Sequence, residues 1–184
     1  MKRITKIALF ALGLAGLAVL GWPALVTAAG DNSSTFDIAC DCRTGAILDG
    51  GVRGGPFIIQ GKMFPAGTLP SGTASNDPTQ PVNGVAAIGD WICRGQAASS
   101  PALPPAYAST PAEFFTQYFI LKNGTITTEC YEGSAGHAGQ CAVTGGVNGF
   151  SGASGDTVTQ PLGTNITGCP NFRVTFRFQP GSLR

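Results

Sequence analysis

The sequence has few charged residues. Only 11% of its 184 residues are Asp, Glu, Lys or Arg, against roughly 25% in a typical soluble domain. The formal net charge is +1, which excludes a strongly basic surface for nucleic acid, because such binding depends on clustered positive charge. Since 43% of the residues are hydrophobic, the low charge does not indicate disorder. We therefore expect a folded protein without a nucleic-acid partner.

The common catalytic motifs are also missing. The sequence contains no G-x-S-x-G, H-E-x-x-H, Walker or C-x-x-C motif. Its single histidine, His137, follows Ala135 and Gly136; a general base needs a positioned partner, so a solvated loop residue is the better interpretation. The spacing of Cys40 and Cys42 matches no zinc ribbon or finger. The sequence predicts neither a metal site nor a cofactor.

The first 28 residues have the pattern of a secretory signal peptide. Lys2, Arg3 and Lys6 precede an apolar run over 7–20, and small residues around Ala28 suit cleavage there. The run is shorter than the roughly 20 residues of a membrane-spanning helix, so an anchor is the weaker alternative. We expect a secreted or periplasmic protein with no stable membrane insertion after cleavage.

The remaining segment, 29–184, is expected to form one domain. Removal of 1–28 takes away three of the 11 basic residues and none of the 10 acidic ones, so the charge becomes about −2. All six cysteines lie in this segment, namely Cys40, Cys42, Cys93, Cys130, Cys141 and Cys169. An even number behind a signal peptide predicts disulfide bonds. Cys130 and Cys141 are the most economical pair, as a clasp across a hairpin.

No stretch of a dozen residues in this segment has a helical period, whereas eight have the alternation, β-branched content and flanking turns of strands. They cover residues 35–43, 56–65, 85–96, 113–122, 125–132, 140–144, 150–160 and 171–179. Asn123-Gly124 favours the tight turn of a hairpin. Two long loops are expected over 69–81 and 99–111.

The pattern predicts an all-β fold, an eight-stranded antiparallel β-barrel stabilised by disulfides, with a β-sandwich as the alternative. A closed barrel leaves no unpaired strand edges, and eight strands enclose space for side chains or one small ligand. In a meander barrel the first and last strands pair. Cys40 and Cys42 would then lie near Cys169.

The segment around Asp90 has two interpretations. If the face of Asp90 and Arg94 points inward, these residues provide an internal ion pair or a ligand contact. If Trp91 and Cys93 point inward, Asp90 faces water. The second interpretation is favoured, because a buried charge is costly unless it is paired.

The stretch 142–146 (AVTGG), followed after a three-residue spacer by Phe150 and then by 152–155 (GASG), resembles a motif of the allene oxide cyclase and dirigent proteins. The final strand (FRVTFRFQPG) and the IGDW segment are similar to theirs. The resemblance implies an eight-stranded, calycin-like barrel with an apolar pocket, and often a homo-oligomer. Asp37 matches an acidic residue of the cyclases, whereas Ala39 stands where they have an asparagine that holds a water.

Taken together, these features predict a barrel that binds a small hydrophobic molecule inside. Candidate ligand-binding residues are Asp90, Trp91, Arg94, Tyr118 and Phe176. A first alternative is a cyclase or isomerase that steers ring closure, with Asp37 as the catalytic residue that polarises the substrate. A second is a non-catalytic surface or interaction protein with a filled barrel. An open apolar interior favours binding, and an added carboxylate there favours the enzyme.

Overall fold

The computed structural model describes residues 32–47, 55–72, 75–97, 113–132 and 140–183. The expected signal segment 1–28, the expected loop 99–111 and His137 lie outside these residues. Among the described residues, no helix has the length and apolar character needed to cross a membrane.

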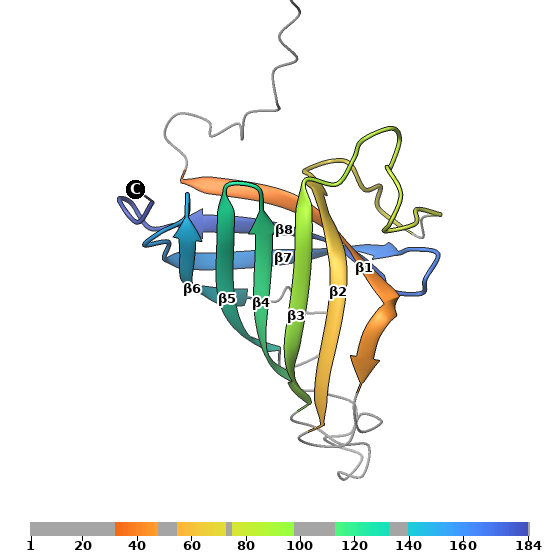
Figure 1. Cartoon of the computed structure of the whole chain (residues 1–184), viewed down its shortest axis with the longest axis horizontal. Coiled ribbons are helices and arrows are strands. Elements are labelled where there is room, and N and C mark those ends of the chain that lie inside the picture. Colours follow the sequence, from red (N-terminus) through yellow and green to blue (C-terminus); the bar gives the residue numbers. More distant parts are fainter. Residues whose placement is uncertain (1–31, 48–54, 73–74, 98–112, 133–139, 184) are drawn as a thin grey trace, which may run out of the picture.

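The described chain forms a closed barrel of eight antiparallel strands in sequence order, which confirms the predicted fold class (Figure 1). The strands are β1 (Ser33–Ile47), β2 (Pro56–Pro65), β3 (Gly89–Ala97), β4 (Glu113–Leu121), β5 (Gly124–Glu132), β6 (Gln140–Asn148), β7 (Gly155–Thr164) and β8 (Pro170–Phe178). A tight turn joins β4 to β5 as predicted, but its two residues are Lys122 and Asn123, since Gly124 is the first residue of β5 and pairs with Leu121.

The strand boundaries differ most from the predicted ones at β1, which continues to Ile47, and at β3, β6 and β7. β3 begins at Gly89 rather than at Val85, because Val85 instead forms a short bridge with Val82. β6 continues through its glycines to Asn148, since a register shift keeps it paired with β5. β7 begins at Gly155 and not at Phe150, which is buried in the turn that precedes the strand.

β1 closes the barrel by pairing with both β8 and β2. Its first half runs beside β8, with Phe36 opposite Val174. Its register with β2 shifts between Asp41 and Ala46, where the strand turns away from β8 (Figure 1). This irregularity bends β1, as β-bulges do. Because of the bend, β1 stays paired with β2 as far as Ile47, beyond the point where its pairing with β8 ends.

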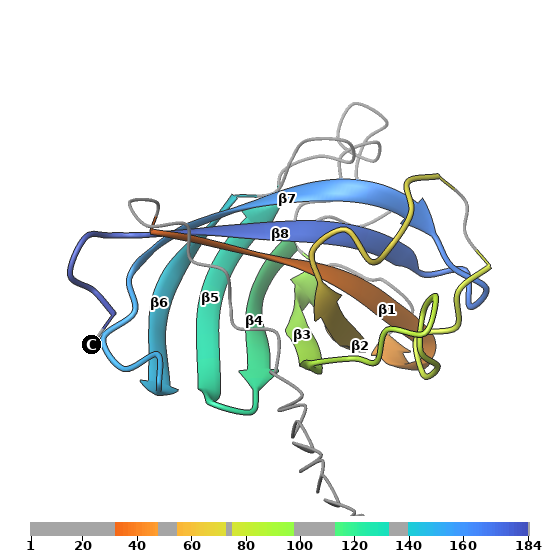
Figure 2. The same cartoon turned by 90° about the horizontal axis from the view of Figure 1, so that it is seen from above.

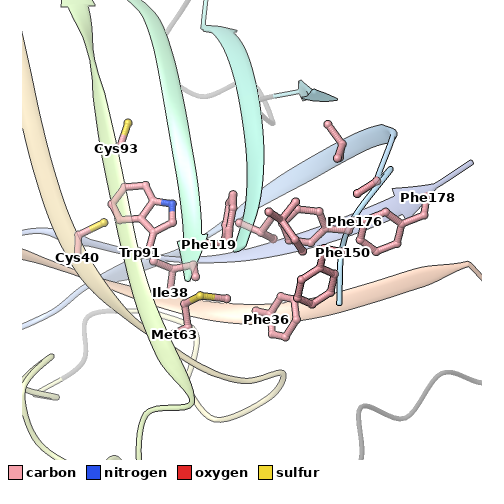
Figure 3. Packing of buried hydrophobic residues seen from close by; sticks show 14 of the residues in the cluster. Phe36, Ile38, Cys40, Met63, Trp91, Cys93, Phe119, Phe150, Phe176 and Phe178 are labelled. Atoms are coloured by element: carbon pink, nitrogen blue, oxygen red, sulfur yellow. The ribbon is translucent and has the colours of Figure 1, made fainter. Parts of the chain in front are cut away.

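One end of the barrel interior is packed with phenylalanine side chains. Phe176 is fully buried and contacts Phe36 and Phe119 edge to face, at ring-centroid distances of 5.9 and 4.8 Å, and stacks on Phe178 at 5.6 Å. Phe150 belongs to the same buried cluster (Figure 3). The alternating pattern of β8 is therefore confirmed, with its phenylalanines inside.

A second, smaller core lies outside the barrel. The connection from β2 to β3 runs along the outside of the barrel near β1 and β7 (Figure 2) and buries Leu69 and Val82 against Ala39, Phe64 and Leu162. The backbone N–H of Gly72 donates to the carbonyl of Leu162. As a result both faces of β1 are buried between Phe36 and Asp41.

Two disulfides connect neighbouring strands. Cys130–Cys141 joins β5 to β6 and confirms the predicted clasp. Cys42–Cys169 ties the second half of β1 to the residue before β8, and Cys169 was expected near this end of the strand. Cys40 and Cys93 are both buried in the barrel and belong to neither of these disulfides.

The packed end should dominate the stability of the barrel. Phe176→Ala is expected to lower the free energy of unfolding by about 4 kcal/mol, because it removes a fully buried ring and leaves a cavity. The control Phe114→Ala removes a ring that is 58% exposed on the outer face and should cost less than about 1 kcal/mol. Urea unfolding of both variants measures the difference, and equal losses would contradict the assigned core.

Candidate functional site

The end of the barrel opposite the phenylalanine cluster contains a cavity of about 270 Å³. It lies where β2, β4, β6 and β8 begin. The described residues that line it are Cys40, Phe57, Ile59, Trp91, Cys93, Phe115, Gln117, Cys141, Thr159, Pro161, Pro170, Asn171 and Phe172. Four of these side chains are aromatic, and none carries a formal charge. Within the described part of the chain, the interior is thus filled at one end and contains a cavity at the other.

Trp91 forms the boundary between the filled and the open part (Figure 3). Its ring meets that of Phe172 edge to face, with centroids 5.2 Å apart. On β2, Gly61 pairs with Trp91 on one side and with Cys40 on the other. A Cβ atom at position 61 would lie 2.5 Å from the carbonyl oxygen of Ala39, so only glycine allows β1 and β2 to approach this closely.

Gln117 is the polar group at the centre of this wall. It is buried, and its Oε1 accepts a hydrogen bond from the indole Nε1–H of Trp91 at 2.8 Å. Its Nε2 lies 3.1 Å from Sγ of Cys130 and 3.4 Å from Sγ of Cys141, the two sulfurs of a disulfide. The carboxamide therefore connects the tryptophan on β3 to the clasp between β5 and β6.

The two remaining cysteines, Cys40 and Cys93, also line the cavity. Burial, together with the nearby Cys93 thiol, raises the pKa of Cys40 far above its usual range. Cys40 is accordingly a thiol at neutral pH and a poor nucleophile. Within the described ranges, no group of three or more His, Cys, Asp or Glu side chains could hold a metal ion.

Asp37 lies on the outer face of β1, beneath the β2–β3 connection. It is fully buried, and its two carboxylate oxygens accept hydrogen bonds from Nε and Nη2 of Arg173 at 2.7 and 3.1 Å. The backbone N–H of Leu69 donates to the same carboxylate at 2.9 Å. The carboxylate raises the pKa of Arg173. Asp37 fastens the connection to β1 and does not line the cavity.

The five predicted ligand-binding residues do not come together. Trp91 lines the cavity, and Phe176 is buried in the packed end. Asp90 and Arg94 are exposed on the outer face of β3: Asp90 pairs with Lys62 at 2.5 Å, and the Arg94 guanidinium lies 5.1 Å from the centre of the Tyr118 ring. The favoured interpretation of this strand, with Trp91 inside and Asp90 in water, is the one observed.

Several cavity residues were not singled out from the sequence. Phe57 and Ile59 alternate with outward residues on β2, and Phe115 and Gln117 do the same on β4. The sequence feature that could have identified Gln117 is its position on the same face of the strand as Phe115 and Phe119. A polar residue within an apolar face needs a buried partner, and here that partner comes from β3.

A second depression, of about 290 Å³, lies on the outer face near Asp41, Lys62 and Asp90. Its charged groups are paired with one another. Arg43 binds both Asp41 and Asp77 at 2.8 Å, and these contacts lower the pKa of each carboxyl group. The described residues of this depression therefore offer no unpaired charge to a ligand, and the barrel interior is the better candidate site.

Comparison with known proteins identifies the fold. No family model matches the chain, and no curated protein matches it in sequence. Sixteen chains of solved structures do match. One of them is a pyocyanin demethylase, which is similar with a TM-score of 0.55 at 14% sequence identity, over 80% of this chain and 99% of that chain. The likeness supports the barrel architecture and does not name an allene oxide cyclase.

The buried ion pair beneath the β2–β3 connection makes a testable contribution to stability. Asp37→Ala leaves Arg173 without its acceptor and the Leu69 N–H unsatisfied, and should lower the free energy of unfolding by about 3 kcal/mol. The matched control is Asp156→Ala. It breaks an exposed pair with Arg177 on β8 and should cost less than about 1 kcal/mol. Similar losses in both variants would overturn the assignment.

Proposed function

We propose that this protein binds a small, flat, hydrophobic molecule in the open end of its barrel. The observation that carries the proposal is the unequal filling of the interior. Large side chains occupy the end around Phe176, whereas a cavity of about 270 Å³ remains beyond Trp91. This volume is near the lower end of the range for ligand pockets, which are typically apolar and contain few polar groups.

The lining of the cavity suits an aromatic ligand. The rings of Trp91, Phe172, Phe115 and Phe57 offer both faces and edges, and aromatic pairs gain energy in offset and edge-to-face contacts. No described residue places a charge in the cavity, so an ion would be bound there at a desolvation cost. The preferred ligand is therefore an uncharged ring system of two or three fused rings.

The structural neighbour gives independent support for a small-molecule site. Its name, pyocyanin demethylase, says that it acts on pyocyanin, so a barrel of this architecture accommodates a small molecule. At 14% identity the similarity concerns the fold, and we do not transfer the substrate or the reaction to this chain.

Binding is favoured over the cyclase alternative by the position of the carboxylates. A cyclase that polarises its substrate needs an acidic group in the pocket, and the described lining residues include none. The carboxylate of Asp37, the candidate for this role, is bound by Arg173 on the outside of the barrel.

We also propose secretion to an oxidising compartment. The signal-like segment 1–28 and the two disulfides both support it.

Filling the cavity should abolish binding. The probe is naphthalene, titrated by calorimetry against the full-length protein. Ile59→Phe adds a ring inside the cavity and should weaken binding at least tenfold, because the added side chain occupies the site of the ligand. Ile58→Phe is the matched control, since the same exchange one residue earlier places the ring on the outer face of β2 and should leave affinity within twofold.

Two results would contradict the proposal. One is that the wild-type protein does not bind naphthalene, even at the highest concentration at which naphthalene dissolves. The other is equal affinity in Ile59→Phe and Ile58→Phe. Urea unfolding of both variants verifies that each is folded.

A further inference from the structure

We infer that Gln117 is the specificity-determining residue of the cavity and selects ring systems that carry a hydrogen-bond acceptor, such as a ring nitrogen or a carbonyl oxygen. The inference deepens the proposed function and rests on it. It concerns the one side-chain carboxamide that both lines the cavity and contacts the disulfide of β5 and β6.

The orientation of this carboxamide follows from its partner. An indole N–H donates hydrogen bonds and accepts none, so the oxygen of Gln117 must be the atom that faces Nε1 of Trp91, at 2.8 Å. The amide NH₂ then points away from Trp91, toward Cys130 and Cys141. A rotated amide would set two donors against each other inside an apolar wall.

The NH₂ group is consequently a donor with poor acceptors. A carboxamide nitrogen has two N–H bonds to donate, and sulfur accepts only weakly. Among the described residues, the acceptors in hydrogen-bonding position to Nε2 are the two sulfurs, at 3.1 and 3.4 Å. A nitrogen or oxygen acceptor on a bound ligand would therefore improve on the contacts that this group already has.

The surrounding side chains restrict the rest of the ligand. The neighbours of Gln117 in the cavity wall include the rings of Trp91, Phe115 and Phe172, which favour a flat apolar skeleton. Because Trp91 holds the amide through its oxygen, the donor has a fixed position before the ligand binds. Such a preorganised group discriminates well between ligands that have an acceptor and isosteres that lack one.

The test compares quinoline with naphthalene, two bicyclic probes of nearly equal shape that differ by one ring nitrogen. Affinities are measured by calorimetry for the wild-type protein and for Gln117→Met, in which an unbranched apolar side chain of similar length replaces the amide. We expect the ratio of quinoline affinity to naphthalene affinity to fall about tenfold in the variant. Naphthalene has no acceptor and serves as the reference probe, so a general effect of the exchange on the cavity cancels in the ratio.

A second variant separates recognition of the ligand from positioning of the tryptophan. Trp91→Phe removes the indole N–H that orients the amide but keeps Gln117, so the preference for quinoline should decrease yet stay above that of Gln117→Met. If Gln117→Met left the ratio of the two affinities unchanged, Gln117 would serve only to hold Trp91 and the inference would be wrong. Failure of naphthalene to bind the wild-type protein would instead refute the proposed function itself.

Discussion

The pairing of β1 with β8 is the constraint on which the other features depend. It closes the sheet, leaves no unpaired edge, and sets a fixed width for the interior. The bend between Asp41 and Ala46 lets β1 continue beside β2, and the disulfide of Cys42 with Cys169 holds the two strands together just beyond that pairing. The Asp37–Arg173 ion pair crosses the same pairing on its outer side.

Within this fixed width, the choice of side chain decides which part of the interior is open. β8 places four phenylalanine or valine side chains along the barrel axis, and those after Phe172 fill their end completely. At the other end Gly61 contributes no side chain and the two cysteines contribute small ones, so one side of the buried Trp91 ring borders the cavity while the ring packs on Phe172. An unfilled apolar volume costs stability, which is a common compromise where a protein binds ligands.

Alternation, turn residues and cysteine spacing were sufficient to predict the barrel and the Cys130–Cys141 clasp, because these features depend on local geometry. The surroundings of Asp37 were not predictable, since alternation shows which residues share a face but not that a distant connection covers it. The resemblance to the cyclases placed a catalytic role on Asp37 that its partners in the structure do not support. Gln117 was missed because its partners come from three other strands.

The proposed function requires that the cavity beyond Trp91 be unfilled and apolar enough to bind an apolar molecule. A crystal structure under xenon pressure tests it directly, because xenon occupies apolar cavities and leaves strong density. We expect a xenon site between the rings of Trp91, Phe115 and Phe172, with none among the phenylalanines around Phe176. Density for side chains that fill the space beyond Trp91, or an interior without xenon, would contradict it.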